Sequence, residues 1–198
     1  MGLTAGVIGV QGDVAEHVLA IERAADTVNV DIDVVAVRQS GHLPSCDIVA
    51  LPGGESTTIS RLIHDYGLAT ELRSHVAQGK PLLATCAGLI VIANDPQDDR
   101  VRSLDLLDVT IERNAFGRQR ESFEAAIEVS GLDEPFPAVF IRAPVIDDPG
   151  ETEVLATVEG RPVAVRDGSI LATSFHPELT GNARIHRLAL FDTLEIRS

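Results

Sequence analysis

Short apolar runs alternate with helical patterns along the first half of the chain. Residues 4–10 (TAGVIGV) predict a β-strand, and residues 13–26 repeat apolar side chains at the spacing of an amphipathic helix. The same alternation continues with strands predicted at 30–37, 47–54 and 80–85, and helices at 57–77 and 86–94. Strands that alternate with helices are typical of right-handed βαβ units around a parallel sheet.

The second half has a different pattern, beginning near residue 104. Short β-rich runs are separated by glycine, proline and acidic turns, and these runs are LLDVTIE, SFEAAIEV, PAVFIRAP, EVLATV, RPVAVRD and SILATSF. Their spacing predicts antiparallel hairpins that extend or flank the sheet, before a last helix over 182–196. We therefore expect one α/β domain, residues 1–198, in three layers: an open, mostly parallel sheet with helices on both faces and antiparallel extensions.

Composition supports a sizeable aliphatic core. The chain has 198 residues, 44% of them hydrophobic, with no tryptophan, one tyrosine and six phenylalanines. No apolar run approaches the ~20 residues of a membrane span, and the first residues lack the basic segment of a signal peptide. Two cysteines are too few for a secreted disulfide framework. These features predict a cytoplasmic protein with reduced thiols and no membrane partner.

The charge of the chain points to a salt-rich environment. The net charge of −14 argues against a nucleic-acid partner, because a phosphate backbone requires a basic surface. Lys80 is the only lysine among sixteen basic residues. An acidic, lysine-poor surface keeps a protein soluble when concentrated salt screens its self-repulsion. We interpret the composition as salt adaptation, with an ordinary acidic protein as the alternative.

Glycine-rich segments end two of the predicted strands, where ligands bind in open parallel sheets. Gly6, Gly9 and Gly12 do not have the spacing of a dinucleotide fingerprint, and LPGGES (51–56) lacks the lysine of a P-loop. Nicotinamide and phosphate sites are therefore not favoured. A Gly-Gly turn at a strand end can instead offer bare N–H groups to a developing oxyanion.

Cys86 lies where the strand 80–85 gives way to a helix, in the segment TCAGL. Such a corner exposes the side chain and places it at a helix N-terminus, which favours the thiolate. A small buried hydrophobe is the alternative for a lone cysteine, and Cys46, in the loop GHLPSCD, fits that role. The choice for Cys86 depends on a nearby base.

A base is available in the segment SFHPELT (174–180). His176 follows a predicted strand, and Glu178 lies two residues further on, so that in extended backbone both side chains point the same way. A carboxylate beside the imidazole fixes its tautomer and stabilises the imidazolium. Of the other histidines, His17 alone lies near a candidate loop, and no histidine spacing predicts a metal site.

Six ordered motifs together give a specific resemblance. They are GVIGVQGDVAEH, LPGGESTTISRL, TCAGLIVIA, ERNAFGRQRESFEA, VFIRAP and SFHPELT, and they extend from residue 6 to about residue 180. In this order they resemble the triad (class I) glutamine amidotransferases, and among these the glutaminase subunits of pyridoxal 5′-phosphate synthase. The resemblance implies the class I amidotransferase fold with a flavodoxin-like core. The acidic loop 94–100 differs from the family pattern, and we expect it to touch none of the motifs.

The resemblance also implies roles for individual residues. Cys86 would be the nucleophile, His176 the general acid–base and Glu178 its orienting carboxylate. The remaining implied positions all contribute to the glutamine site or its oxyanion hole: Gly53, Gly54, Glu55, Ser56, Arg113, Ile141 and Arg142. A guanidinium suits this task, because it binds an amino-acid carboxylate in a planar, bidentate geometry. Read without the motifs, either arginine would be a surface cation.

The expected reaction is hydrolysis of L-glutamine to glutamate and ammonia through a γ-glutamyl thioester. As the resemblance implies, a separate synthase subunit would use the ammonia to build pyridoxal 5′-phosphate, and this chain would need no cofactor or metal. Two alternatives stay open. The chain could be a glutaminase that serves another amidotransferase pathway, or a non-catalytic regulatory subunit of the same fold.

Overall fold

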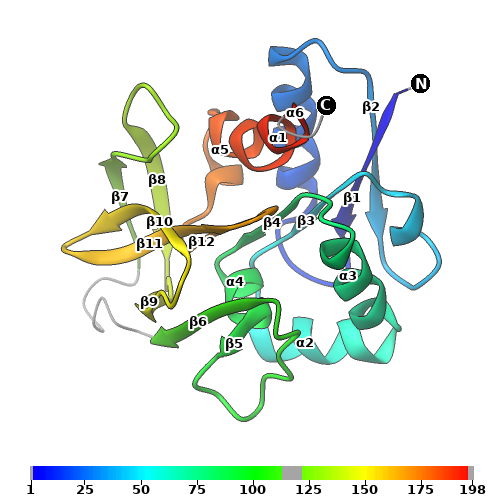
Figure 1. The fold of residues 1–198 in the computed structure, drawn as a ribbon, viewed down its shortest axis with the longest axis horizontal. Helices are drawn as coiled ribbons and strands as arrows, with labels where there is room; N and C mark the ends of the chain where they lie inside the picture. Colours follow the sequence, from blue (N-terminus) through cyan, green and yellow to red (C-terminus); the bar gives the residue numbers. More distant parts are fainter. Residues whose placement is uncertain (1, 113–121, 196–198) are drawn as a thin grey trace.

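A seven-stranded sheet forms the centre of the molecule (Figure 1). The computed structural model describes residues 2–112 and 122–195. Within these residues, the strands of the sheet follow the order β10-β11-β12-β4-β3-β1-β2. In that order their bounds are Glu153–Val158, Arg161–Asp167, Ile170–Thr173, Leu82–Thr85, Ile48–Leu51, Leu3–Ile8 and Ile32–Val37.

Five neighbouring strands of this sheet are parallel. β1 pairs in parallel with β2 and β3, β3 pairs with β4, and β4 pairs with β12. Taken by themselves, these strands have the flavodoxin-like order 2-1-3-4-5. β11 and β10 then continue the sheet as antiparallel strands. The predicted fold class is confirmed, with one correction: the last strand of the second half belongs to the parallel core rather than to a flanking hairpin.

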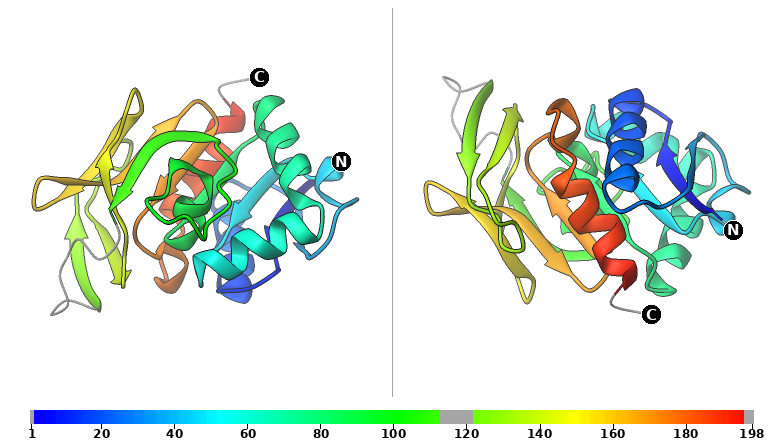
Figure 2. Two further views of the ribbon diagram at one scale, coloured as in Figure 1. Left: turned by 90° about the horizontal axis from the view of Figure 1, so that it is seen from below. Right: turned by 90° about the horizontal axis from the view of Figure 1, so that it is seen from above.

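Helices cover both faces of the sheet (Figure 2). One face carries α1 (Val14–Thr27) and the C-terminal helix, which runs through α5 (Arg184–His186), a π-helical stretch (Arg187–Phe191) and α6 (Asp192–Glu195). The other face carries α2 (Ser56–Asp65), α3 (Leu68–Ala77) and α4 (Ala87–Ile92).

Strand β3 shows how one sequence serves both cores. Ile48 and Ala50 are buried in the core beneath α1, whereas Val49 and Leu51 are buried in the core beneath α2 and α3. Successive side chains of a strand point to opposite faces, so a strand covered on both faces becomes a continuous apolar run. Among the described helices, none is both long enough and apolar enough to cross a membrane.

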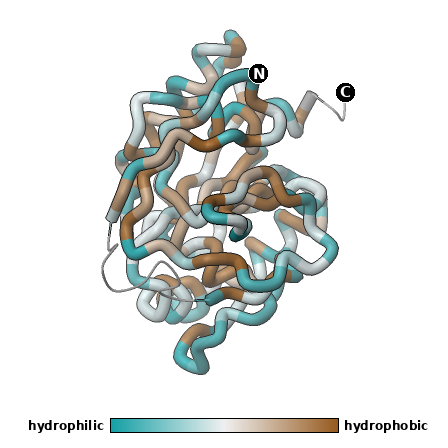
Figure 3. The backbone as a smooth tube through the Cα atoms, turned by 90° about the vertical axis from the view of Figure 1, so that its left-hand side faces the viewer, coloured by the Kyte–Doolittle hydropathy of each residue, from teal (hydrophilic) through white to brown (hydrophobic). Residues whose placement is uncertain are grey.

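Two smaller sheets lie beside the main one. The first contains β5 (Ala93–Asp95), β6 (Leu107–Glu112) and β9 (Val145–Asp148), and the second is the hairpin of β7 (Ser122–Ile127) and β8 (Phe136–Ile141). Phe140 of the hairpin meets Phe175 edge-on, with ring centroids 5.5 Å apart. This contact joins the hairpin to the segment that leads into His176. In Figure 3 the brown, apolar stretches of the tube lie mainly inside the molecule and the teal stretches mainly in its outer loops.

Two predicted element boundaries change because of tertiary contacts. The helix expected over 86–94 ends at Ile92, where backbone N–H groups of Leu104 and Leu106 bind the carbonyls of Val91 and Ile92. The chain then enters β5, which pairs with β6. β9 was likewise not predicted, because a strand of four residues is defined by its partner rather than by its own pattern.

Candidate active site

Four parallel strands end at one edge of the sheet, and a cleft opens there. The loops that follow β1, β3, β4 and β12 carry Gln11, Gly54, Cys86 and His176 into this cleft, which has a volume of about 1100 Å³. The other residues that line it are Asp13, Glu55, Ser56, Ala87, Ile90, residues 97–100, Ile141, Arg142, Pro144 and Leu179. A cleft outside the carboxyl ends of parallel strands is the usual ligand position in such sheets.

Cys86 occupies a strained corner between β4 and α4. Its φ of 49° and ψ of −107° lie outside the regions that side chains other than glycine readily adopt. Strain of this kind persists only where surrounding contacts enforce it, and here the Cys86 amide donates to the Thr173 carbonyl at 2.8 Å. A Cβ on Gly88 would collide with the Leu51 carbonyl, so the turn also requires glycine there.

The sequence predicts that this corner exposes the thiol, and the structure shows the thiol buried instead. Cys86 retains only 7% of its accessible surface, although it lines the cleft. Its Sγ lies 3.9 Å from the Ile141 carbonyl, and β8 therefore covers it from the side. Cys46 is fully buried, and its burial raises the pKa of that thiol. An inert packing role fits Cys46, as expected from the sequence.

His176 and Glu178 form a buried pair beside Cys86. The Nδ1 of His176 is 2.6 Å from the Oε1 of Glu178, and their side chains are 6% and 0% exposed. The sequence predicts this contact through extended backbone, but Pro177–Leu179 form a 3₁₀ turn that brings the two side chains together. The backbone N–H of His176 donates to the Val139 carbonyl at 2.8 Å, so the neighbouring hairpin also fixes this residue.

The surroundings favour the imidazolium form of His176. Burial lowers its pKa, but hydrogen bonding to Asp13, Cys86 and Glu178 outweighs burial and raises the pKa well above the ordinary range. Burial raises the pKa of Glu178, and its hydrogen bond to His176 opposes that rise. With Nδ1 held by the carboxylate, the Nε2 of His176 is the nitrogen available for proton exchange in the cleft.

Asp13 is a cleft residue that sequence reasoning did not single out. Its Oδ2 lies 3.4 Å from the same Nδ1 of His176, and Asp13, His176 and Glu178 place ligand atoms within 4.8 Å of one another. A metal ion would need the ring nitrogen that already binds Glu178 at 2.6 Å. The geometry therefore favours a hydrogen-bonded carboxylate cluster. The position of Asp13 directly after the β1 loop was the available signal.

The predicted oxyanion turn packs directly against the reactive side chains. A Cβ on Gly53 would lie 2.7 Å from His176 Cε1 and 3.2 Å from Cys86 Cβ. Gly54 has a φ of 152°, and the Oε1 of Gln11 accepts the Glu55 amide beside it at 2.9 Å. Only a residue without a side chain fits between this turn and the Cys86–His176 pair.

Glu55 and Ser56 begin helix α2. The Glu55 carboxylate accepts hydrogen bonds from the Thr57 and Thr58 amides at 3.2 and 2.8 Å, which is the geometry of a helix N-cap. Hydrogen bonds from Thr57 and then Thr58 outweigh the effect of burial and lower the pKa of Glu55 to about 2. The side chain of Glu55 thus caps α2, and its backbone amide donates to Gln11 Oε1. Ser56 is buried at the same helix end.

The far wall of the cleft comes from the end of β8. Ile141 and Arg142 both line the cleft, and Arg142 has a positive φ of 43°. Arg113, predicted to bind glutamine, lies outside the described residues. The structure therefore brings every described candidate to one cleft, with Gly53 packed behind the reactive pair.

The prediction that the acidic loop 94–100 touches none of the motifs is wrong. Gln97, Asp98, Asp99 and Arg100 line the cleft, although the sequence suggested that this loop touches no motif. Arg100 donates through Nε and Nη2 to the Asp98 carboxylate, both at 2.9 Å. The loop reaches the cleft because the chain folds back after α4, which a local pattern does not reveal.

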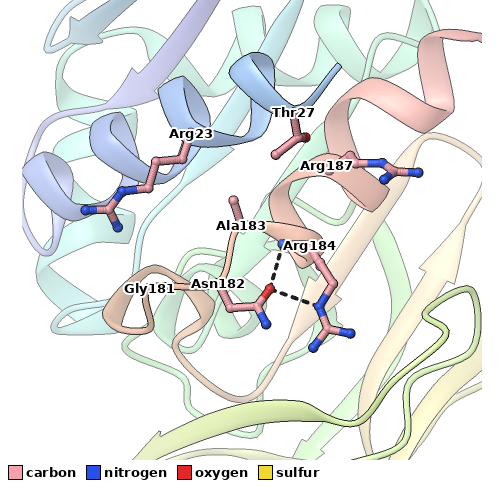
Figure 4. A pocket seen from close by; sticks show the side chains of 7 residues that line it. All are labelled: Arg23, Thr27, Gly181, Asn182, Ala183, Arg184 and Arg187. Atoms are coloured by element: carbon pink, nitrogen blue, oxygen red, sulfur yellow. Dashed lines mark hydrogen bonds between the residues drawn. The ribbon is translucent and has the colours of Figure 1, made fainter. Parts of the chain in front are cut away.

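A second cavity of about 500 Å³ lies between α1 and the C-terminal helix (Figure 4). Arg23, Arg184 and Arg187 line it, but Figure 4 shows their guanidinium groups pointing in different directions. Arg184 is held by Asn182 and by the carbonyls of Glu134 and Pro135. These arginines do not converge on a common anion.

Comparison with known proteins agrees with this geometry. The model of the SNO glutamine amidotransferase family matches residues 7–193. A solved structure described as a glutamine amidotransferase superposes with a TM-score of 0.83 at 43% identity, covering 97% of each chain. The PurLQS structure from Thermotoga maritima, at 16% identity and a TM-score of 0.67, shares the fold.

Relatives with high identity carry one name. A Haloarcula marismortui protein named pyridoxal 5′-phosphate synthase subunit PdxT is 65% identical over 196 residues, covering 98% of this chain and 100% of that protein. A Halobacterium salinarum protein of the same name is 63% identical over 193 residues, covering 97% and 95%. The halophilic archaeal sources of these relatives fit the salt-adapted composition. The chain belongs to the SNO glutamine amidotransferase family.

Proposed function

We propose that the chain hydrolyses L-glutamine to L-glutamate and ammonia through Cys86, His176 and Glu178. This proposal rests on one observation: the strained Cys86 corner and the His176–Glu178 pair, 2.6 Å apart, lie in the same cleft. The chain is also a member of a glutamine amidotransferase family.

The reaction follows from the positions of these groups. The Cys86 thiolate attacks the side-chain carbonyl carbon of glutamine and forms a C–S bond, which gives a tetrahedral oxyanion. The His176 imidazolium donates its Nε2 proton to the leaving nitrogen, the C–N bond breaks, and ammonia departs from a γ-glutamyl thioester. His176, now neutral, removes a proton from water, which attacks the thioester carbonyl. The C–S bond then breaks, which releases glutamate and restores the Cys86 thiolate and the His176 imidazolium. Glu178 stays ionised and holds His176 through Nδ1.

Binding of glutamine is assigned to the remaining cleft residues. Backbone N–H groups at Gly53–Gly54 would stabilise the oxyanion, and backbone at Glu55 together with Ser56 would line the side-chain amide. The guanidinium groups of Arg142 and Arg113 would hold the α-carboxylate. Burial of Cys86 to 7% exposure supports a site that excludes water around the thioester.

The proposed partner is a synthase subunit that uses the ammonia to make pyridoxal 5′-phosphate. The names of the relatives support this assignment, since they describe subunits of pyridoxal 5′-phosphate synthase. We further propose that residues 1–198 work as one glutaminase domain in the cytoplasm, with no cofactor of their own.

The test is the fate of the amide nitrogen. Glutamine labelled with ¹⁵N in its side-chain amide is incubated with this chain, with its candidate synthase, and with both together in the presence of pentose and triose phosphates. We expect glutamate release to require this chain and to increase when the synthase is added. We also expect the ¹⁵N label to appear in the pyridoxal 5′-phosphate ring.

The same experiment separates the alternative functions. Turnover of glutamine without ¹⁵N in the product would indicate a glutaminase that serves another pathway. No glutamate release in any mixture, with the synthase active on free ammonia, would indicate a regulatory subunit and would overturn the proposal.

A further inference from the structure

Two further histidines lie directly behind the His176–Glu178 pair. His17 of α1 and His186 of α5 are both fully buried. The Nδ1 of His17 is 3.1 Å from the Nε2 of His186. The Nε2 of His17 is 3.1 Å from Thr85 Oγ1 and 3.4 Å from the Oε2 of Glu178. A line of polar side chains therefore continues from the cleft into the interior, and the reaction described above does not use its inner half.

The second carboxylate oxygen of Glu178, Oε2, needs a hydrogen-bond donor. Oε1 binds His176, whereas Oε2 is buried and has no hydrogen-bond partner of standard geometry within the part of the chain that the structure describes. An unsatisfied buried carboxylate oxygen destabilises the ionised form of the acid. The His17 Nε2 faces it at 3.4 Å, a separation that a small closure on substrate binding would shorten to a hydrogen bond.

Burial favours the neutral form of both inner histidines. Burial is the main cause that lowers the pKa of His17 well below its ordinary value, and burial also lowers the pKa of His186 to about 3. The ionisable groups around Glu178 are His176, His17 and Asp13. Each inner ring thus carries one N–H, and the question is which nitrogen holds it.

The contacts favour one tautomer arrangement. If His186 donates from Nε2 to the Nδ1 of His17, the N–H of His17 lies on Nε2 and points to Thr85 and Glu178. The reverse arrangement would direct a lone pair of His17 at the carboxylate. It would also leave a buried N–H at the Nδ1 of His186, which has no partner among the described residues. An orphaned N–H and a lone pair facing a carboxylate are both unfavourable, so the first arrangement prevails.

We propose that His17 is a positioning residue that donates from Nε2 to the Oε2 of Glu178, and that His186 sets its tautomer. The inference deepens the proposed glutaminase function and rests on it. His17 also contacts Thr85, the residue before the nucleophile. One imidazole therefore links the end of β4, which carries Cys86, to the turn that carries the base. The π-helical stretch that begins at Arg187 follows His186 directly, and such irregularities often occur at functional positions.

Loss of the donor should weaken the base and leave substrate binding nearly unchanged. Without it, Glu178 holds the imidazolium of His176 less strongly, so the pKa of His176 falls and the basic limb of kcat moves to lower pH. We expect His17→Phe to lower kcat about 10- to 100-fold, the factor that accompanies loss of a hydrogen bond to a buried charge. KM should change less than about twofold, because no substrate contact is removed.

Matched variants separate positioning from packing. Glutaminase kinetics are measured on the complex with the synthase for the wild type, His17→Phe and His17→Gln. Phenylalanine preserves the ring and most of the volume, whereas glutamine keeps an N–H donor near the Nε2 position. A positioning role predicts that glutamine restores much of kcat and phenylalanine does not, and the opposite order would overturn the inference. His75→Phe and His75→Gln are controls, since His75 is buried and bonded to the Pro81 carbonyl outside the cleft.

A second measurement needs no variant. In wild-type protein labelled with ¹⁵N-histidine, nitrogen chemical shifts report which ring nitrogen carries the proton. We expect His17 to be neutral between pH 5 and 8, with its proton on Nε2. A proton on Nδ1, or titration of His17 in this range, would overturn the inference even if the variants fail to fold. An inactive wild-type complex would instead count against the proposed function, and the two failures are therefore distinguishable.

Discussion

Substitution of Gly53 by alanine isolates the close packing between the oxyanion turn and the reactive pair. The added Cβ would lie 2.7 Å from His176 Cε1 and 3.2 Å from Cys86 Cβ. Ordinary contact between such atoms begins near 3.4 Å, so the ring has to move by more than half an ångström. His176 has little freedom to do so, because Val139 holds its amide at 2.8 Å and Glu178 holds its Nδ1 at 2.6 Å.

The expected effect is large on catalysis and moderate on stability. A misplacement of about 1 Å in a catalytic group costs on the order of 10²-fold in rate. We therefore expect kcat of Gly53→Ala to fall roughly 30- to 300-fold. Insertion of one methyl group into a packed site costs about 1–3 kcal/mol, which for a chain of this size lowers Tm by roughly 2–12 °C. Folding should therefore survive.

The assay measures glutamate formation by the complex at saturating glutamine, together with the rate of Cys86 alkylation by iodoacetamide. Both rates should fall in Gly53→Ala, because the displaced imidazolium no longer pairs with the thiolate. Gly181→Ala is the matched control, since nothing lies within 4 Å of a Cβ at that position. A kcat of Gly53→Ala within twofold of the wild type would show that the turn does not constrain His176.

Three other predictions concern the nucleophile, the helix cap and the surface charge. Cys86→Ala should abolish glutamate formation while circular dichroism stays unchanged, and Cys46→Ala should remain active although it loses buried packing. Hydrogen bonds donated by Thr57 and then by Thr58 lower the pKa of Glu55 to about 2. The cap therefore stabilises the fold above pH 4.5 and loses its effect as the pH falls toward 2. Because this carboxylate is largely exposed, we expect Glu55→Gln to cost about 1 kcal/mol at pH 7 and nothing near pH 2, as measured by urea unfolding. The Tm should rise with KCl well beyond ~0.15 M, where the Debye length is about 8 Å, and a flat or falling Tm would mean that the acidic surface is incidental.

Local chemistry made much of the site predictable. A strand that switches to a helix at T-C-A-G-L requires a tight corner, and the structure has one, with Cys86 at a φ of 49°. The pairing of His176 with Glu178 also follows from two nearby residues in sequence, although the turn that joins them differs from the predicted one. Burial of the thiol was not predictable, because the cover comes from Ile141, 55 residues away.

Long-range contacts account for the rest. β12 pairs with β4 across more than 80 residues, and no local pattern distinguishes this parallel strand from the antiparallel strands beside it. The partners of His17 are 68 and 169 residues away, so in the sequence it is one polar residue on an otherwise apolar helix face. The sequence predicts that the acidic loop 94–100 touches no motif. Its residues 97–100 line the cleft because the chain folds back after α4, where the amides of Leu104 and Leu106 bind the carbonyls of Val91 and Ile92.

The cleft has a buried side and an open side, and this division predicts which kinetic constant each substitution changes. His176 and Glu178 are 6% and 0% exposed in their side chains, and they act on charge that develops only during the reaction. Arg142 is exposed and lines the cleft, where it can hold the charged end of an amino acid equally in the ground and transition states. Uniform binding of this kind raises KM when it is lost and leaves kcat nearly unchanged. Arg142→Gln should therefore raise KM for glutamine at least tenfold with little change in kcat, and a fall in kcat alone would place Arg142 among the groups that act on the transition state.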